Sequence, residues 1–178
     1  PVNNLGQLRT NIGDARILGL ESVFDFNLKK VLQMNNDFVL NYFINTSFIN
    51  SEYTQAITNG ILGKQVEFVP NINLKTGLKF GYKNFSTSLQ YTYLSSQFTD
   101  AQNSGSGDIS GIVGEIPAYW VHDLSARIDF NRCFIEGGSN NALNASYFTR
   151  RATGYPGPGI IPSAPRTFYI NIGLHLWK

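Results

Sequence analysis

Apolar and polar residues alternate strictly near the end of the chain. The apolar positions are Phe168, Ile170, Ile172, Leu174 and Leu176, and the positions between them are Tyr169, Asn171, Gly173, His175 and Trp177. A period of two residues is that of a β-strand with one apolar and one mixed polar face. The same period recurs in segments that are long for strands of a globular protein. The pattern therefore predicts an all-β chain whose antiparallel strands form the wall of a transmembrane β-barrel.

Six further strands follow from the same alternation. We expect them over residues 18–28, 38–48, 72–82, 85–93, 120–130 and 134–143. Lys75 and Lys79 lie within the third, on its polar face, where charged groups need water or partners. The sixth alternates poorly, and its Gly137-Gly138 pair predicts a bulge or a bend.

The connections between these strands alternate in length. Short ones cover residues 29–36, 83–84 and 131–133, and long ones cover residues 50–67, 98–118 and 147–166. Bacterial barrels have short periplasmic turns, long extracellular loops and an even number of strands. Seven strands with a periplasmic C-terminus place residue 1 outside the cell, so we expect residues 1–178 to be the C-terminal part of a larger barrel. The alternative is a small complete barrel with an eighth strand from residues 1–11.

Composition supports a membrane wall. Charged residues make up 15% of the chain, against about 25% in soluble domains. The net charge is +2 without a basic run, which excludes nucleic acid as an expected partner. Aromatic residues near the strand ends predict two interfacial girdles. The outer girdle is Tyr119, Trp120, Tyr147, Phe148 and Phe168, and the inner one is Tyr82, Phe85, Phe130, Phe134 and Trp177.

Four segments together carry a family resemblance. Residues 137–148, Gly-Gly-Ser-Asn-Asn-Ala-Leu-Asn-Ala-Ser-Tyr-Phe, resemble the Asn-rich penultimate strand of TonB-dependent outer-membrane receptors. Leu176-Trp177 resembles their terminal assembly signal, although Lys178 follows where an aromatic residue usually ends the chain. Residues 149–169 are similar to the last extracellular loop of ferric-citrate receptor-like members, as found in Bacteroidetes-type bacteria, and residues 11–21 to the Gly-x-Glu strand start of these receptors.

The resemblance implies a fold and a function. It implies a barrel of about 22 strands in the outer membrane of a Gram-negative bacterium, containing a plug domain that residues 1–178 lack. It further implies import of a ferric chelate, such as iron citrate or a siderophore, driven by the TonB complex through the plug. The lipid bilayer and the barrel assembly machinery are the other implied partners. No cofactor and no enzymatic activity are expected.

Arg150, Arg151, Tyr155 and Arg166 are the candidate ligand-binding residues. They lie in or beside a loop stiffened by proline and glycine, and guanidinium groups bind carboxylates of a citrate-like ligand in a bidentate manner. The alternative is that these arginines pair with carboxylates of the lumen or with anions of the outer leaflet.

Rival functions find less support in the residues. His122 and His175 fall on opposite strand faces and Cys133 is a lone cysteine, so no metal site is expected. No nucleophile motif accompanies either histidine, which argues against an outer-membrane hydrolase. A small barrel acting as an anchor or passive pore, and a soluble β-sandwich, remain as alternatives.

Overall fold

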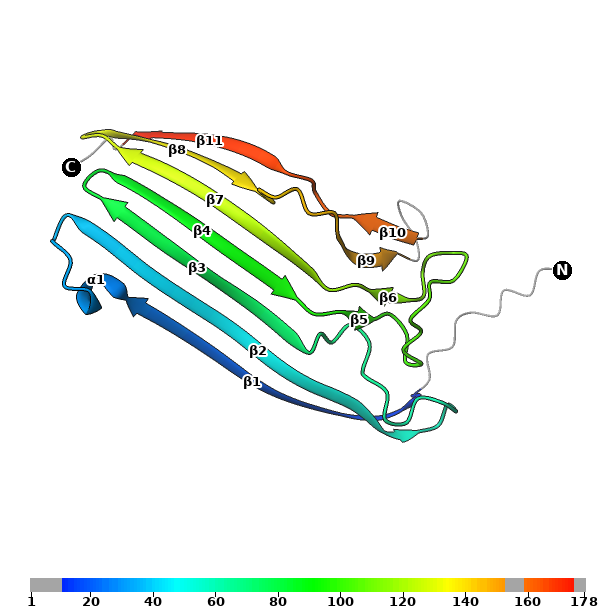
Figure 1. Ribbon diagram of the computed structural model, residues 1–178. Coiled ribbons are helices and arrows are strands. Elements are labelled where there is room, and N and C mark those ends of the chain that lie inside the picture. The colour runs from blue at the N-terminus through cyan, green and yellow to red at the C-terminus, as the bar shows by residue number, and fades with distance from the viewer. Residues whose placement is uncertain (1–10, 153–158, 175–178) are drawn as a thin grey trace.

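The computed structural model describes residues 11–152 and 159–174, whose long strands form one curved sheet (Figure 1). Seven antiparallel strands lie in the order β1-β2-β3-β4-β7-β8-β11. Their bounds are β1 Gly13–Asn27, β2 Phe38–Ala56, β3 Ile72–Tyr82, β4 Phe85–Leu94, β7 Tyr119–Asp129, β8 Cys133–Asn140 and β11 Thr167–Leu174. Each strand pairs with the next large strand along the chain, as in an up-and-down barrel wall.

The remaining elements are short. Four strands lie at the end of the sheet that carries the long loops, and they pair as β5 (Gln97–Phe98) with β6 (Glu115–Ile116) and β9 (Phe148–Ala152) with β10 (Gly159–Pro162). The one-turn helix α1 (Leu28–Val31) begins where the Asn27 side chain accepts a hydrogen bond from Lys30 N at 3.2 Å. None of the helices in residues 11–152 and 159–174 is long and apolar enough to cross a membrane.

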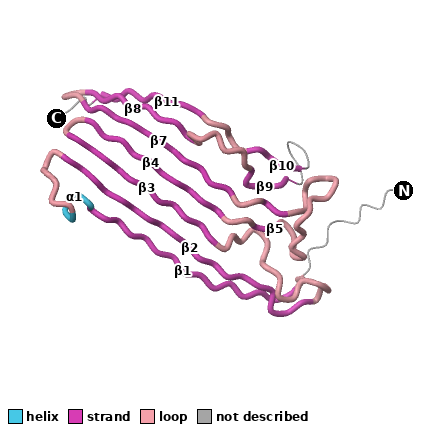
Figure 2. The backbone as a smooth tube through the Cα atoms, in the orientation of Figure 1, coloured by secondary structure: helices cyan, strands magenta, loops and turns pink. Residues whose placement is uncertain are grey.

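The alternation of connection lengths is confirmed. Short turns gather at one end of the sheet and long loops at the other (Figure 2). Seven predicted strands are present, but β2 continues to Ala56, so residues 50–56, expected in a loop, are a strand. They extend beyond the pairing with β3, which ends at Phe48, by roughly 26 Å at 3.3 Å per residue. Ser51 and Tyr53 are buried against residues 63–67, whereas Asn50, Thr54, Gln55 and Ala56 are exposed, so the alternation of a lipid-facing strand stops there.

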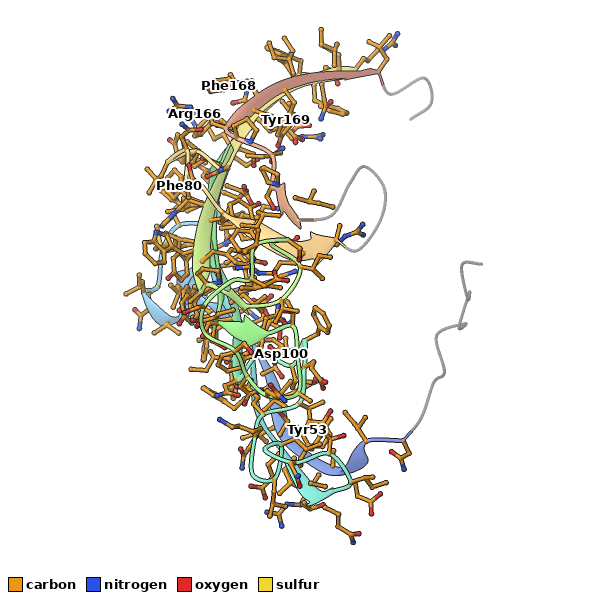
Figure 3. The ribbon with its side chains drawn as sticks, turned by 90° about the vertical axis from the view of Figure 1, so that its right-hand side faces the viewer. Tyr53, Phe80, Asp100, Arg166, Phe168 and Tyr169 are labelled. Carbon is orange, nitrogen blue, oxygen red and sulfur yellow. The ribbon has the colours of Figure 1, made fainter. Side chains whose placement is uncertain are left out.

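The two faces of the sheet differ as predicted. Phe80 and Phe168 lie on the convex face, and Tyr53 and Tyr169 on the concave face (Figure 3). Cross-strand pairs such as Leu78 with Leu89 and Leu89 with Leu124 carry the apolar row along the convex side. The convex face is therefore the one that meets lipid, and the concave face lines the lumen.

The predicted bulge at Gly137-Gly138 is wrong. Both glycines pair in unbroken register with β7 and β11. Gly138 is needed because the Tyr169 ring crosses its face, so that a Cβ would lie 2.5 Å from Tyr169 Cζ. The sequence does not alternate regularly here because a glycine occupies the position that the aromatic ring of the neighbouring strand covers. Such coverage of a glycine by an aromatic side chain is known to stabilise sheets.

Two other details of the sequence analysis are also corrected. Phe134 does not belong to the inner girdle, because its ring lies on the lumenal side 3.5 Å from the Arg127 guanidinium carbon. The sixth strand ends at Asn140 rather than Leu143, because Asn141 adopts a positive φ of 50° that breaks the extended backbone. Trp177 and His175 lie outside the described residues.

Candidate functional site

Two surfaces of the molecule could act in function. The lumenal wall is the set of side chains on the concave face of the seven strands. The outer loop layer consists of residues 57–71, 95–118, 141–152 and 159–166, at the extracellular end.

The outer loop layer has a small core of its own. Ile61 and Ile116 are each 1% exposed and are the largest fully buried side chains among the described residues. At the end of β2, the Tyr53 hydroxyl donates a hydrogen bond to Glu67 Oε2 at 2.5 Å. Burial, followed by this bond to the carboxylate, raises the pKa of Tyr53 to about 12. The loops are thus packed onto the end of β2 as a folded layer.

A reciprocal pair of hydrogen bonds joins two of the long loops. Gln65 N donates to Asn103 Oδ1 at 2.7 Å, and Asn103 Nδ2 donates to Gln65 O at 2.8 Å. The asparagine side chain imitates a backbone partner in this way, and its φ of 55° is one that Asn tolerates. Phe68 N adds a bond to Phe98 O at 2.9 Å. Residues 57–71 are therefore tied to residues 95–118.

Arg151 ties the second loop to the third. Its Nη1 donates to Gly111 O at 2.9 Å and its Nη2 donates to Glu115 O at 2.8 Å. Its guanidinium also lies 5.2 Å from the centre of the Phe148 ring. Bonds from a charged donor to backbone carbonyls are stronger than neutral ones. Arg151 is thus a brace between strand β9 and residues 111–115.

Asn141 organises the last loop from a buried position. It is 3% exposed, its Nδ2 donates to Ala145 O at 2.9 Å, and its Oδ1 accepts from Ala145 N at 2.8 Å. Its backbone N donates to Asp123 Oδ1 at 2.9 Å, which connects the loop to the lumenal wall. The Asn-rich stretch singled out in the sequence therefore shapes the loop backbone.

The structure keeps apart the three predicted ligand-binding residues that it describes, Arg150, Arg151 and Arg166. Arg150 pairs with Ile161 and Arg151 with Ile160, so the two arginines leave the hairpin on opposite sides. Arg150 is exposed and makes no hydrogen bond or ion pair with the residues that the structure describes. Arg166 lies on the convex side near Phe168 (Figure 3), and its Nη1 donates to Ala142 O at 3.2 Å. Tyr155 lies outside the described residues.

The lumenal wall carries a polar network in its inner half. Arg127 donates from Nε to both carboxylate oxygens of Asp129, at 3.1 and 3.0 Å, and its Nη1 lies 3.8 Å from Glu136 Oε2. Tyr169 donates to Glu136 Oε1 at 3.4 Å. The network links three strands, which agrees with the polar lumen expected for these barrels. No cluster of three or more metal-ligating side chains occurs in the described part of the chain.

A family model for TonB dependent receptor-like β-barrels matches residues 1–170. The chain belongs to this family. Members of the TonB-dependent receptor family are outer-membrane β-barrel proteins of Gram-negative bacteria, and they are receptors and transporters rather than enzymes. No curated protein matches the chain.

Solved structures support the same fold. The unliganded ferric citrate transporter FecA superposes with a TM-score of 0.79 at 24% identity, over 90% of this chain and 24% of that one. The ferric yersiniabactin uptake receptor FyuA from Yersinia pestis superposes with a TM-score of 0.69 at 19% identity, over 91% of this chain and 24% of that one. The siderophore receptor PiuA from Acinetobacter baumannii superposes with a TM-score of 0.66 at 17% identity, over 91% of this chain and 22% of that one. The chain thus spans about a quarter of the length of each.

Sequence reasoning missed the residues that join the loops. Asn103, Gln65 and Thr99 carry no spacing that marks them, because their partners are backbone groups of distant segments. Thr99 Oγ1, for example, donates to Gly114 O and accepts from Gly114 N, both at 2.9 Å. The sequence carries no composition signal for them either, because residues 98–118 contain a single asparagine, Asn103.

Proposed function

We propose that this TonB-dependent receptor chain is the C-terminal part of a plugged barrel of about 22 strands that imports a ferric chelate bearing carboxylates, such as iron citrate. The likeness of its wall to that of the ferric citrate transporter, with a TM-score of 0.79, is the observation that carries the proposal. In this proposal the plug contacts the TonB complex, the assembly machinery inserts the barrel, and lipid surrounds the convex face.

An open sheet favours a larger barrel over a small self-contained pore. Strands β1 and β11 stand at opposite edges of the seven-stranded sheet and do not pair with each other. A lone barrel of this size would need those edges to close, because unpaired edges in a membrane leave backbone groups without partners. Additional strands of a larger barrel would supply those partners.

The braced outer loop layer is the part we assign to chelate capture. Arg150 is an exposed arginine of this layer with no hydrogen bond or ion pair to the described residues, and it stands on the β9–β10 hairpin, which projects on the concave side in orange (Figure 3). Arg151 holds the same hairpin to residues 111–115 with its guanidinium. We infer that Arg150, together with Tyr155, contacts carboxylates of the chelate, whereas Arg151 positions the hairpin.

The test measures binding of ferric citrate to the intact receptor that contains this sequence. Arg150→Ala should weaken binding about tenfold or more, because a hydrogen bond to a charged group is worth about 1.5–3 kcal/mol. Arg150→Lys should keep part of the affinity, since the charge remains but the bidentate fork is lost. Arg16→Ala, on the convex rim and paired with Glu52, is the matched control and should bind normally.

Arg151→Ala separates positioning from contact. It should weaken binding and also speed amide hydrogen exchange over residues 107–116, whereas Arg150→Ala should leave that exchange unchanged. Unaltered affinity in Arg150→Ala would remove Arg150 from the site. An intact receptor that neither binds nor takes up ferric citrate would refute the chelate class proposed here, whatever the variants do.

A further inference from the structure

A groove runs along strand β8 on the convex, lipid-facing side of the sheet. Paired residues of β7, β8 and β11 form rows across the groove. In one row, Ser139 lies between Leu124 of β7 and Phe168 of β11. In the next row towards the short turns, Gly137 lies between Ala126 and Ile170. Since Gly137 has no side chain and Ser139 a short one, the centre of each row is hollow. The cavity has a volume of about 390 Å³.

The groove has a closed lower end. In the next row Ile135 pairs with Ile128 on one side and Ile172 on the other, so three isoleucines fill the convex face there. At Gly137 the space is real, because a Cβ would meet only Tyr169 O, at an ordinary 3.7 Å. The two hollow rows span roughly 7 Å along the strand, which suits several methylene groups of an acyl chain.

A cation stands at the outer end of the same groove. The Arg166 guanidinium carbon lies 5.9 Å from the centre of the Phe168 ring, and both side chains are on the convex face (Figure 3). Arg166 is exposed and forms no ion pair within the described residues; its Nη1 contact is the uncharged Ala142 O. The nearest acidic side chain in register, Asp123, lies on the concave face and is bonded to Asn141 N. Arg166 therefore keeps its charge available on the membrane side.

A buried hydroxyl inside the groove also lacks a partner. Ser139 is 8% exposed, and its Oγ makes no hydrogen bond to the residues that the structure describes. A buried polar group without a partner is costly, above all beside hydrocarbon. Because this oxygen has less than 1 Å² of accessible surface, it lies beneath the surface of the groove and does not face a bound lipid.

We propose that this groove binds one phosphorylated glycolipid of the outer leaflet, with an acyl chain along Gly137 and the phosphate on Arg166. The occupant follows from three features: an apolar channel, an unpaired cation, and a position at the end of the wall that carries the long extracellular loops. Arginine binds phosphate in a bidentate manner, and Trp120, 51% exposed on the same face, marks the interfacial level. The site is independent of the chelate proposal, since it lies on the opposite face of the sheet.

The test uses the intact receptor, stripped of lipid in detergent and titrated with monophosphorylated lipid A while bound lipid is counted by native mass spectrometry. Wild type should bind one tight equivalent. Arg166→Ala should weaken binding about tenfold, the value of a charged hydrogen bond, and Gly137→Leu should weaken it similarly by filling the channel. Ala126→Leu fills the channel from β7 and replaces Gly137→Leu if that variant does not fold.

Controls separate this site from general attraction to the membrane. Arg16→Ala removes a rim cation of the same convex face at the β1 edge and should bind like wild type. Phosphatidylglycerol, tested in parallel, should bind more weakly; equal binding would overturn the assignment to a glycolipid. Unchanged lipid A binding in both Arg166→Ala and a channel-filling variant would overturn the site itself, and unchanged binding in the channel-filling variants alone would overturn the acyl position. Ferric citrate binding should be the same in all of these variants.

Discussion

The membrane wall and the outer loop layer are built in different ways. In the wall, large apolar side chains stay exposed on the convex face, and Phe168, Ile170 and Ile172 are each at least 73% exposed. In the loop layer, Ile61 and Ile116 are 1% exposed. The wall is held by its ladder of backbone hydrogen bonds with lipid as its solvent, while the loop layer folds as a small water-exposed domain does, around a buried core.

Because of this difference, the wall and the outer loop layer meet different structural requirements. A wall without an internal core can be lengthened strand by strand around a barrel, and its lumenal side chains are free to vary in charge. The loop layer must keep its shape above the membrane, where its hydrogen bonds compete with water, and it does so through packed isoleucines and side chains such as Asn103 and Arg151 that bind distant backbone groups.

The largest expected effect tests the core of the loop layer. Ile116→Ala should destabilise the layer by about 2–5 kcal/mol, because the side chain is fully buried and leaves a cavity. Ile109→Ala, in the same loop but fully exposed, should cost almost nothing. Hydrogen exchange of the intact receptor measures both, with faster exchange expected over residues 57–71 and 95–118 only. Equal exchange in the two variants would contradict the idea of a separate core.

The next effect concerns the wall. Leu78→Arg places a charge in the middle of the lipid-facing side and should destabilise the folded barrel by about 2–4 kcal/mol. Gln90→Arg, on the lumenal face opposite Asp123, is the matched control and should cost little. Urea unfolding of the intact receptor in lipid vesicles compares them. If Gln90→Arg were the more damaging of the two, our assignment of the faces would be reversed.

The smallest effect concerns Tyr53 and pH. Tyr53→Phe should destabilise the loop layer by about 1–2 kcal/mol near neutral pH, through loss of the bond to the Glu67 carboxylate. Because the folded pKa is raised from 10.0 to about 12, the stabilisation is fully present below pH 10 and is lost as the pH rises towards 12. Exchange rates measured across that range should rise in wild type more than in Tyr53→Phe. Parallel pH profiles would show that the hydroxyl is ionised as in an unfolded chain.

The strands were predictable from sequence wherever lipid lay on one side and water on the other. The periods of two at residues 72–82 and 85–93 matched β3 and β4 closely, since the environment of each face dictates residue type. Prediction failed where that contrast disappears. Residues 50–56 continue beyond the pairing with β3, and only Ser51 and Tyr53 among them are buried. Gly137-Gly138 keeps a regular ladder, and Tyr169 covers Gly138 from the neighbouring strand.

The candidate site was predictable only in part. Sequence marked a loop rich in arginine, proline and glycine, but it could not show that Arg150 and Arg151 point to opposite sides of a hairpin or that Arg166 faces the membrane. All three residues carry the same charge, and all three lie in or beside the same loop. Arg151 donates to the backbone carbonyls of residues 111 and 115, and Arg166 to that of residue 142, and no sequence pattern identifies these acceptors.

Local alternation and loop length were enough to predict the class of fold, the faces of the regularly alternating strands and the side of the membrane on which the long loops lie. Tertiary structure alone decided which loops are tied together, which arginine is free and where the groove on β8 lies. These properties depend on register between strands and on contacts between residues far apart in the chain, and no local pattern encodes such contacts.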